Sequence, residues 1–241
     1  MSRKAELMVI IMPMTETSGN RLDLVRLMQL ASPGLPVGGF HYSQGLETCV
    51  EDGWVSDLES FSGWLHSMFR ETLVHLEIPL LKRLSSAFRD GQPADFDHWC
   101  CYLMASRETR EFRLEEKARG QAMLRLMDSL AVEVPATLRS SVGESQLAGF
   151  AVMCQAWGLE LASLATAYAF SMLENQVTAG IKLIPLGQSD GQRTLFAVGS
   201  LIPVWVEQGL AVRDEEIGAS THALGLVSSR HEIQYTRLFR S

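Results

Sequence analysis

Residues 30–55 read LASPGLPVGGFHYSQGLETCVEDGWV, and no other part of the chain holds proline and glycine so densely. Prolines fix the backbone φ angle, and glycines permit left-handed or closely packed backbone. Apolar residues ahead of the stretch recur at helical spacing, so a helix should end near Ser32, directly before a proline. Ser43 should cap a second helix, which stops near Gly53. The stretch is therefore predicted to be a rigid, irregular loop between two helices.

This loop also carries apolar and aromatic side chains, namely Leu35, Val37, Phe40 and Tyr42. Such residues predict a loop that packs onto the protein instead of extending into solvent. One interpretation is a structural corner, which the residues by themselves favour. The other is a shaped docking surface, because loops held on a rigid scaffold often carry function.

Helical spacing of apolar residues continues through most of the remaining sequence. Asp57 should cap a long helix that runs to about Gly91, and Pro79 should bend or split it. Residues 128–144 are expected to form a long connection that can include a short helix, 187–191 a glycine-rich turn and 181–186 a brief strand-like stretch. Further helices are expected from Asp95 or Asp97, over 106–127, 145–157, 161–179 and 195–210 with a kink at Pro203, and from Asp214 or Glu215 through Leu226.

These patterns predict an all-α fold, a single-domain helical bundle of about ten helices with Pro/Gly-rich connecting loops. Residues 1–20 are expected to be a flexible N-terminal segment, 21–227 the helical domain and 228–241 a C-terminal tail. No clear repeat and no linker-like composition divides the chain.

The composition is that of an ordinary globular protein: 46% of the 241 residues are hydrophobic, 20% are charged, and the net charge is -7. This acidic balance argues against nucleic-acid binding, which usually shows a basic excess. The four cysteines show no disulfide framework, as expected for reduced thiols. No signal peptide is recognisable, and the apolar stretch 161–173 is too short to span a membrane. A cytoplasmic location is therefore expected.

Two further segments are rich in charge. Between Arg107 and Arg119 lie five basic and four acidic residues, and an exposed helix face with surface ion pairs is the default interpretation of such a pattern. The C-terminal segment SSRHEIQYTRLFRS, residues 228–241, mixes arginine with aromatic residues. Because arginine and aromatic side chains are frequent interface anchors, this segment suits partner docking better than an idle solvated tail.

Four segments together resemble the urease accessory protein UreF family: LASPGLPVGGFHYSQGLE with VEDGWV, SRETREFR from Ser106, GIKLIPLGQSDGQ from Gly180, and the C-terminal segment. His41 and Asp52 depart from the family pattern without disturbing its glycines and prolines. Further departures are Phe112, Ile233 and Thr236. The resemblance raises the prospect that some charges between Arg107 and Arg119 are buried pairs or partner contacts.

The resemblance implies a function that the residues alone do not give. A UreF protein is expected to be an all-α, dimerising accessory protein, not an enzyme, that supports nickel insertion into apo-urease. It is expected to bridge UreD (also called UreH) and the GTPase UreG on apo-urease, and to regulate GTP hydrolysis by UreG. No cofactor of its own, no nucleic acid and no membrane is expected, and nickel is handled by the assembled complex.

The residues expected to contact partners come from all four segments. We expect the C-terminal tail to order on binding, so that deleting residues 230–241 would abolish complex formation and leave the fold intact. The expected partner-contact residues are Phe40, Tyr42, Gln44, Glu47, Arg107, Glu108, Arg110, Lys182, Gln188, Gln192, Arg230, His231, Glu232, Gln234, Tyr235, Arg237, Phe239 and Arg240.

A serine hydrolase is one alternative. Residues 187–191, GQSDG, match the G-x-S-x-G pattern with Ser189 as nucleophile, and Asp214 and then His222 or His231 follow in the order of an α/β-hydrolase triad. The pattern requires a parallel sheet around the nucleophile, which the helical spacing does not predict. A turn between helices is therefore the favoured interpretation of this segment.

An intrinsic nickel carrier is the other alternative. His98 and Cys101 are spaced to share a helix face, and His41 and Cys49 flank part of the opening loop. No C-x-x-C pair or H-E-x-x-H motif occurs, and a two-residue face is weak support for a metal site. No tight metal site is predicted.

Overall fold

The computed structural model describes residues 16–219 and 221–241, and in this part of the chain helices are the only regular elements. Counting α3, η2 and α4 as one helix and α10 with α11 as another gives ten helices, which confirms the predicted all-α fold. The elements are α1 (Glu16–Ala31), the 3₁₀ turn η1 (Gly39–His41), α2 (Leu46–Glu51), α3 (Leu58–Met68), the π-helix η2 (Phe69–Glu77), α4 (Ile78–Arg89), α5 (Pro93–Ser106), α6 (Arg110–Ser129), α7 (Arg139–Glu144), α8 (Gln146–Ala156), α9 (Leu161–Leu183), α10 (Gln188–Gly199), α11 (Ile202–Ala211), the 3₁₀ turn η3 (Asp214–Glu216) and α12 (His222–His231).

Several helices begin and end at the residues that the sequence predicted. At the start of α3, Asp57 accepts a hydrogen bond from the backbone N–H of Ser60 at 2.9 Å. At the start of α8, Ser145 Oγ accepts from the backbone N–H of Ala148 at 3.3 Å. Helix α1 ends at Ala31, just ahead of the first proline of the opening loop. Each cap satisfies a backbone group that the helix itself leaves unpaired.

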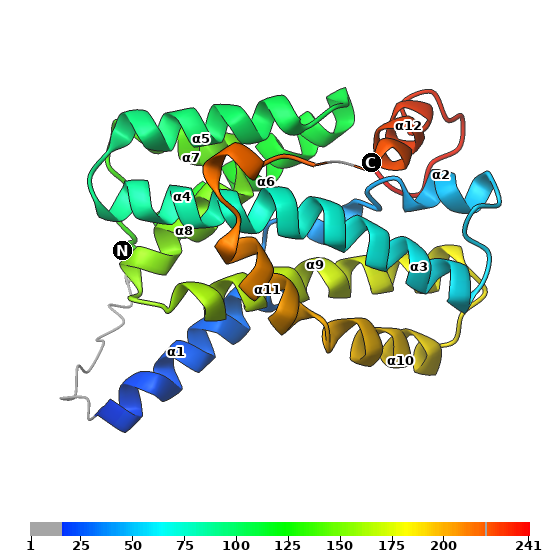
Figure 1. Cartoon of the computed structure of the whole chain (residues 1–241), viewed down its shortest axis with the longest axis horizontal. Helices are drawn as coiled ribbons and strands as arrows, with labels where there is room; N and C mark the ends of the chain where they lie inside the picture. The colour runs from blue at the N-terminus through cyan, green and yellow to red at the C-terminus, as the bar shows by residue number, and fades with distance from the viewer. Residues whose placement is uncertain (1–15, 220) are drawn as a thin grey trace, which may run out of the picture.

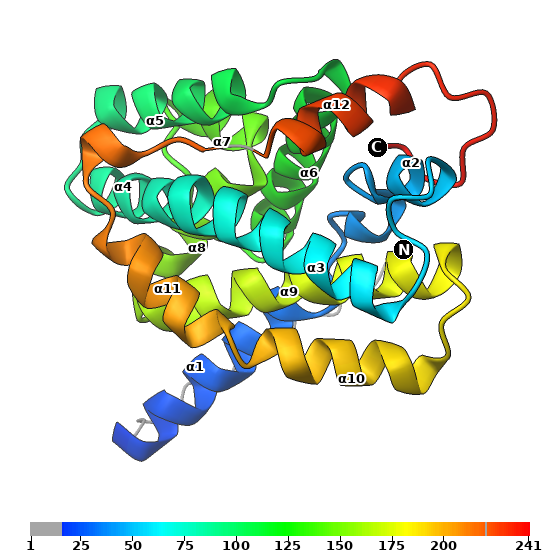
Figure 2. The ribbon, with the colours of Figure 1, turned by 45° about the vertical axis from the view of Figure 1, so that its right-hand side comes forward.

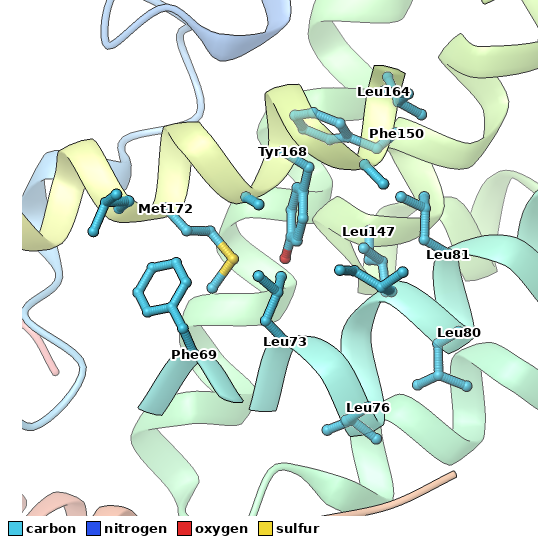
Figure 3. Packing of buried hydrophobic residues seen from close by; sticks show 14 of the residues in the cluster. Phe69, Leu73, Leu76, Leu80, Leu81, Leu147, Phe150, Leu164, Tyr168 and Met172 are labelled. Carbon is cyan, nitrogen blue, oxygen red and sulfur yellow. The ribbon is translucent and has the colours of Figure 1, made fainter. Parts of the chain in front are cut away.

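Helix α9 is central to the bundle and packs against α1, α10 and α11 (Figure 1). Helix α4 packs against α5 and α8, while α6 packs against α7 and α8. Figure 3 shows the core where η2, α4, α8 and α9 meet, formed by Phe69, Leu73, Leu76, Leu80, Leu81, Leu147, Phe150, Leu164, Tyr168 and Met172.

Pro79 lies inside a helical run and does not end it. The π-helix η2 immediately precedes α4, so the backbone is already widened before the proline is reached. A proline has no N–H and would leave the carbonyl of His75 without its usual helical donor. The backbone N–H of Gly218, next to η3, donates to that carbonyl at 2.9 Å. Of the predicted bend or split, the split does not occur, because a π-helical widening and a donor from a distant loop accommodate the proline.

The region from residue 181 to 226 differs most from the prediction. Residues 181–183 end α9 instead of forming a strand, and residues 188–191 open α10 instead of a turn. The predicted kink at Pro203 is a break at Ser200 and Leu201, and the proline lies in the first turn of α11, where a missing N–H costs little. The last helix begins at His222, after η3. The range Gln188–Ala211, which spans α10 and α11, is long and apolar enough to cross a membrane. A single helix of this kind is weak evidence for a membrane span, because core helices pass the same test.

The predicted segment boundaries also differ from the structure. Residues 1–15 of the expected flexible segment lie outside the described residues, while residues 16–20 belong to α1. The expected tail boundary at residue 228 falls inside α12. The segment from 228 therefore continues a helix of the bundle.

The crossing of α6 with the α7–α8 connection depends on Gly120. A Cβ atom there would lie 2.5 Å from the backbone nitrogen of Ser145 and 2.8 Å from the carbonyl oxygen of Gly143. These neighbours are backbone atoms, which cannot move aside as the end of a flexible side chain could. Gly120→Ala is therefore expected to lower the free energy of unfolding by about 1–3 kcal/mol. Gly63→Ala on α3 is the matched control, because nothing lies within 4 Å of its added Cβ. The control should gain about 0.5–1 kcal/mol, and urea unfolding of both variants measures the difference.

Candidate functional site

The opening loop is closed by the C-terminal residue Ser241. The backbone N–H groups of Ser43 and Gln44 donate to its backbone oxygen at 2.7 and 3.0 Å, and Ser43 Oγ donates to the same oxygen at 2.6 Å. Gln44 has a φ of 52°, which is uncommon for a residue with a side chain. Its side chain donates to Glu115 at 3.0 Å and accepts from Gln176 at 3.3 Å. Figure 2 shows the C-terminal end returning to α2 in this way.

An ion network lies under this loop, in the interior of the bundle. Arg107, between α5 and α6, donates to Glu77 at 2.6 Å and to Glu116 at 2.7 Å. The other oxygen of Glu116 accepts from Ser145 Oγ at 2.9 Å. Both glutamates are buried. The network therefore joins η2, α6 and the start of α8 through charge-assisted hydrogen bonds.

Burial and pairing together set the charges of this network. Burial opposes the charge of Arg107, but Glu116 and Glu77 outweigh it and raise the pKa of the guanidinium. Burial likewise favours a raised pKa for Glu116, yet Arg107 and Arg119 hold it below its usual value. Burial, and then Glu77, raise the pKa of Tyr168 well above its usual value. Tyr168 therefore stays neutral and donates to Glu77 at 3.1 Å.

A second buried pair connects this network to the C-terminal residue. Arg119 donates to Glu115 at 2.8 Å, and Ser241 Oγ donates to the other oxygen of Glu115 at 2.7 Å. Tyr42 of the opening loop is also buried, and burial followed by the charge of Glu115 raises its pKa. The exposed-face interpretation of the segment from Arg107 to Arg119 is therefore wrong for four of its charges, which form the pairs Arg107–Glu116 and Arg119–Glu115 in the interior.

His231 lies at the end of α12 between two carboxylates and is fully buried. Its Nδ1 is 2.6 Å from Glu111 and its Nε2 is 3.3 Å from Glu47. Each ring nitrogen of His231 therefore lies within hydrogen-bond distance of a carboxylate oxygen from a different helix. Arg237 donates to the second oxygen of Glu111 at 2.6 Å. These contacts join α2, α6 and α12 at one point.

The C-terminal segment after α12 is packed onto the bundle. Glu47 accepts the backbone N–H groups of Leu238 and Phe239 at 2.6 and 2.9 Å. Phe239 and Ser241 are buried, whereas the side chain of Leu238 is exposed. The expectation that deleting residues 230–241 leaves the fold intact is therefore corrected, because the deletion would remove partners of buried carboxylates.

The structure brings together only some of the expected partner-contact residues. Lys182 reaches the site from α9, with Nζ 5.7 Å from the centroid of the Phe239 ring. Gln188 and Gln192 lie apart from it, on an open groove of α10 beside the exposed Phe196. The structure buries Tyr42, Glu47, His231 and Phe239, partly buries Gln44, Arg107, Glu232 and Gln234, and exposes Phe40, Glu108, Arg110, Lys182, Gln188, Gln192, Arg230, Tyr235, Arg237 and Arg240.

Sequence reasoning missed several members of the buried network. Four of them lie in the segment between Arg107 and Arg119, where charged residues of both signs are unusually frequent: Glu111, Glu115, Glu116 and Arg119. That high density of charge was the only signal in the sequence that pointed to them. Glu77 gave no such signal. It stands in an apolar helical pattern, and its partner Arg107 is thirty residues away.

The structure contradicts the hydrolase alternative. Ser189 lies in the first turn of α10, and no strand precedes it within the described part of the chain. Both nitrogens of His231 face carboxylates, and Asp214 instead pairs with Arg83 on α4. A nucleophile elbow needs a strand, a sharp turn and a free imidazole, so this arrangement does not activate Ser189. Within the same residues, no group of three or more His, Cys, Asp or Glu is placed to hold a metal ion.

Comparison with known proteins identifies the chain. The family model of UreF matches residues 55–199. The urease accessory protein UreF of Pseudomonas putida (strain W619) is 47% identical over 220 residues, which cover 91% of this chain and 98% of that protein. The protein of the same name from Alcanivorax borkumensis is 42% identical over 228 residues, covering 92% of this chain and 100% of that protein. The UreF protein of Klebsiella pneumoniae subsp. pneumoniae is 42% identical over 217 residues, which cover 90% of this chain and 97% of that protein. The sequence resemblance is thereby confirmed, and the chain belongs to the UreF family of urease accessory proteins.

Proposed function

We propose that this chain is an accessory protein of urease maturation that is required for nickel insertion into apo-urease. It bridges UreD/UreH and the GTPase UreG and regulates GTP hydrolysis by UreG. It acts in the cytoplasm as a homodimer, holds no cofactor of its own, and catalyses no reaction alone. Nickel is the cargo of the assembled complex in this proposal.

The observation that carries this proposal is the convergence of three segments on one region. The opening loop, the charged segment that starts at Arg107 and the C-terminal segment are connected by hydrogen bonds to the buried residues Glu47 and Glu115. The same segments also carry exposed aromatic side chains, Phe40 in the opening loop and Tyr235 in the C-terminal segment. A rigid framework that presents exposed aromatic side chains suits protein binding.

Reconstitution from purified components tests the proposal. The chain is mixed with UreD/UreH, UreG and apo-urease, and the products are separated by size-exclusion chromatography with light scattering. We expect UreG to co-elute with UreD/UreH only when the chain is present, and the GTP hydrolysis rate of UreG to change in the complex. Ser189→Ala should assemble like the wild type, because Ser189 has no catalytic role in this proposal. Co-elution of UreG with UreD/UreH in the absence of the chain would contradict bridging.

A further inference from the structure

A small cavity lies beneath the opening loop, between α6 and α9. Its lining includes Tyr42 of the loop, Arg119 of α6 and Gln176 of α9. The cavity volume is about 10 Å³, which is close to the least that a single water molecule requires. Only 8% of Arg119 and 2% of Gln176 is exposed, so both side chains are withdrawn from bulk solvent. The cavity therefore has room for one water-sized ligand.

Two buried polar atoms of these lining residues have no hydrogen-bond partner among the residues that the structure describes. They are Nε of Arg119, which can only donate, and Oε1 of Gln176, which can only accept. A buried polar atom that stays unpaired is costly, and such atoms are rare in folded proteins. Since both side chains line one cavity, a single bound group can supply both missing contacts.

Rotation of the Gln176 amide would not remove its unpaired oxygen. Nε2 of Gln176 donates to the carbonyl oxygen of Ser43 at 3.1 Å and to Oε1 of Gln44 at 3.3 Å. Gln44 is fixed in turn, because its own Nε2 donates to Glu115 at 3.0 Å. Exchanging the nitrogen and oxygen of Gln176 would therefore place oxygen against oxygen twice. Arg119 is held as well, since its Nη1 donates to Glu115 at 2.8 Å.

The charges and polar atoms around the cavity determine the chemical class of its ligand. A cation would meet the guanidinium of Arg119 and could not accept from its Nε. An anion could accept from Nε, but it would meet the carboxylate of Glu115 and could not donate to Gln176. A water molecule both accepts and donates, and so satisfies the two unpaired atoms at once. Tyr42 and Asn175 line the same cavity and offer further polar partners.

We propose that one structural water molecule binds in this cavity, accepts from Arg119 Nε and donates to Gln176 Oε1. The water joins α6 to α9 directly under the opening loop. It thereby holds Gln176 in the orientation in which its Nε2 donates to the backbone of Ser43. The inference goes beyond the proposed function, because it concerns a ligand of the free chain and involves no partner protein.

A high-resolution crystal structure of the full wild-type chain tests this site. We expect one density peak with Arg119 Nε and Gln176 Oε1 each about 2.7–3.2 Å away. A crystal soaked in bromide should give no anomalous signal at this peak, because the site does not accept anions. Clear density for both side chains with no peak between them would overturn the proposal. A bromide signal, or a direct contact between the two side chains, would overturn it equally.

Nuclear magnetic resonance tests the same site in solution. The Nε–H proton of Arg119, identified by its loss in Arg119→Lys, should show a dipolar cross-peak to water that does not arise from proton exchange. Gln176→Met is nearly isosteric but removes the acceptor, so we expect this cross-peak to disappear. Gln121→Met is the matched control, because Gln121 lies on α6 outside the cavity lining and donates to Gly143 instead.

The solution outcomes are also decisive. A cross-peak that is present in the wild type and in Gln121→Met, and absent in Gln176→Met, would support the proposal. A cross-peak that persists unchanged in Gln176→Met would show that Gln176 does not hold the water, and would overturn it. The crystallographic test uses the wild-type chain alone, so its result stands whether or not the variants fold.

Discussion

Replacing Arg107 with alanine is expected to lower the free energy of unfolding by about 3–5 kcal/mol. The guanidinium pairs with both Glu77 and Glu116, and its removal leaves two buried carboxylates without their main counter-charge. A buried charge that loses its partner cannot recover its hydration, so the loss exceeds that of a surface ion pair. Chemical denaturation followed by circular dichroism measures the difference.

The effect of this variant should depend on pH. Since the pKa of Glu116 is lowered in the fold, its stabilising contribution is present above its unfolded pKa and is lost as pH falls through the folded value. In Arg107→Ala, burial still raises the pKa of Glu116 while a main lowering charge is gone, so the carboxyl takes up a proton at higher pH. This protonation removes the unpaired buried charge from the variant. The difference in free energy of unfolding between wild type and variant should therefore become smaller as the pH falls from about 7 to about 4.5.

Two further variants make the Arg107 prediction specific. Arg89→Ala removes an exposed arginine that pairs with its neighbour Asp90, and it should leave stability nearly unchanged. Arg107→Lys keeps the charge but cannot reproduce the forked contacts, so an intermediate loss is expected. A loss below about 1 kcal/mol for Arg107→Ala would mean that the buried network contributes little to the fold.

Deleting residues 232–241 is expected to destabilise the protein by about 3 kcal/mol or more. The deletion takes away the buried ring of Phe239 and the two backbone donors to Glu47. It also removes Ser241, which donates to the buried Glu115 and accepts from the opening loop. The segment is thus expected to act as part of the fold. Thermal and urea unfolding measure the loss.

The double variant Ile233→Ala/Tyr235→Ala is the control for this deletion. Both side chains are exposed, so stability should stay within about 0.5 kcal/mol of the wild type. A deletion variant that unfolds at the same urea concentration as the wild type would show that the packed C-terminal segment does not stabilise the bundle. That result would restore the independent tail expected from the sequence.

Local signals in the sequence predicted much of the fold. Asp57 and Ser145 cap helices because their side chains accept from backbone groups a few residues away, a pattern that sequence shows directly. The glycine-rich segment at Gly187 was harder to interpret. Asp190 accepts from the backbone N–H of Gly187 at 3.3 Å and so starts α10, although glycine, serine and aspartate together also typify a turn.

The buried network could not be predicted in the same way. Alternating charges between Arg107 and Arg119 are equally compatible with an exposed helix face and with buried pairs, and only tertiary packing decides between them. Glu77 and Glu47 meet partners far along the chain, and no spacing rule relates residues at such separations. The packing of the C-terminal segment onto α2 became visible only in the structure. Its docking role stays a prediction.

Urease activity in cells that lack this chain tests the central claim most directly. The account predicts that the deletion strain accumulates urease protein with little activity and little bound nickel, at low and at raised nickel in the medium. The wild-type chain and Ser189→Ala should both restore activity and nickel content, because the chain supports assembly without catalysing a reaction. Full urease activity in the deletion strain at limiting nickel would contradict the account, as would a failure of Ser189→Ala alone to restore it.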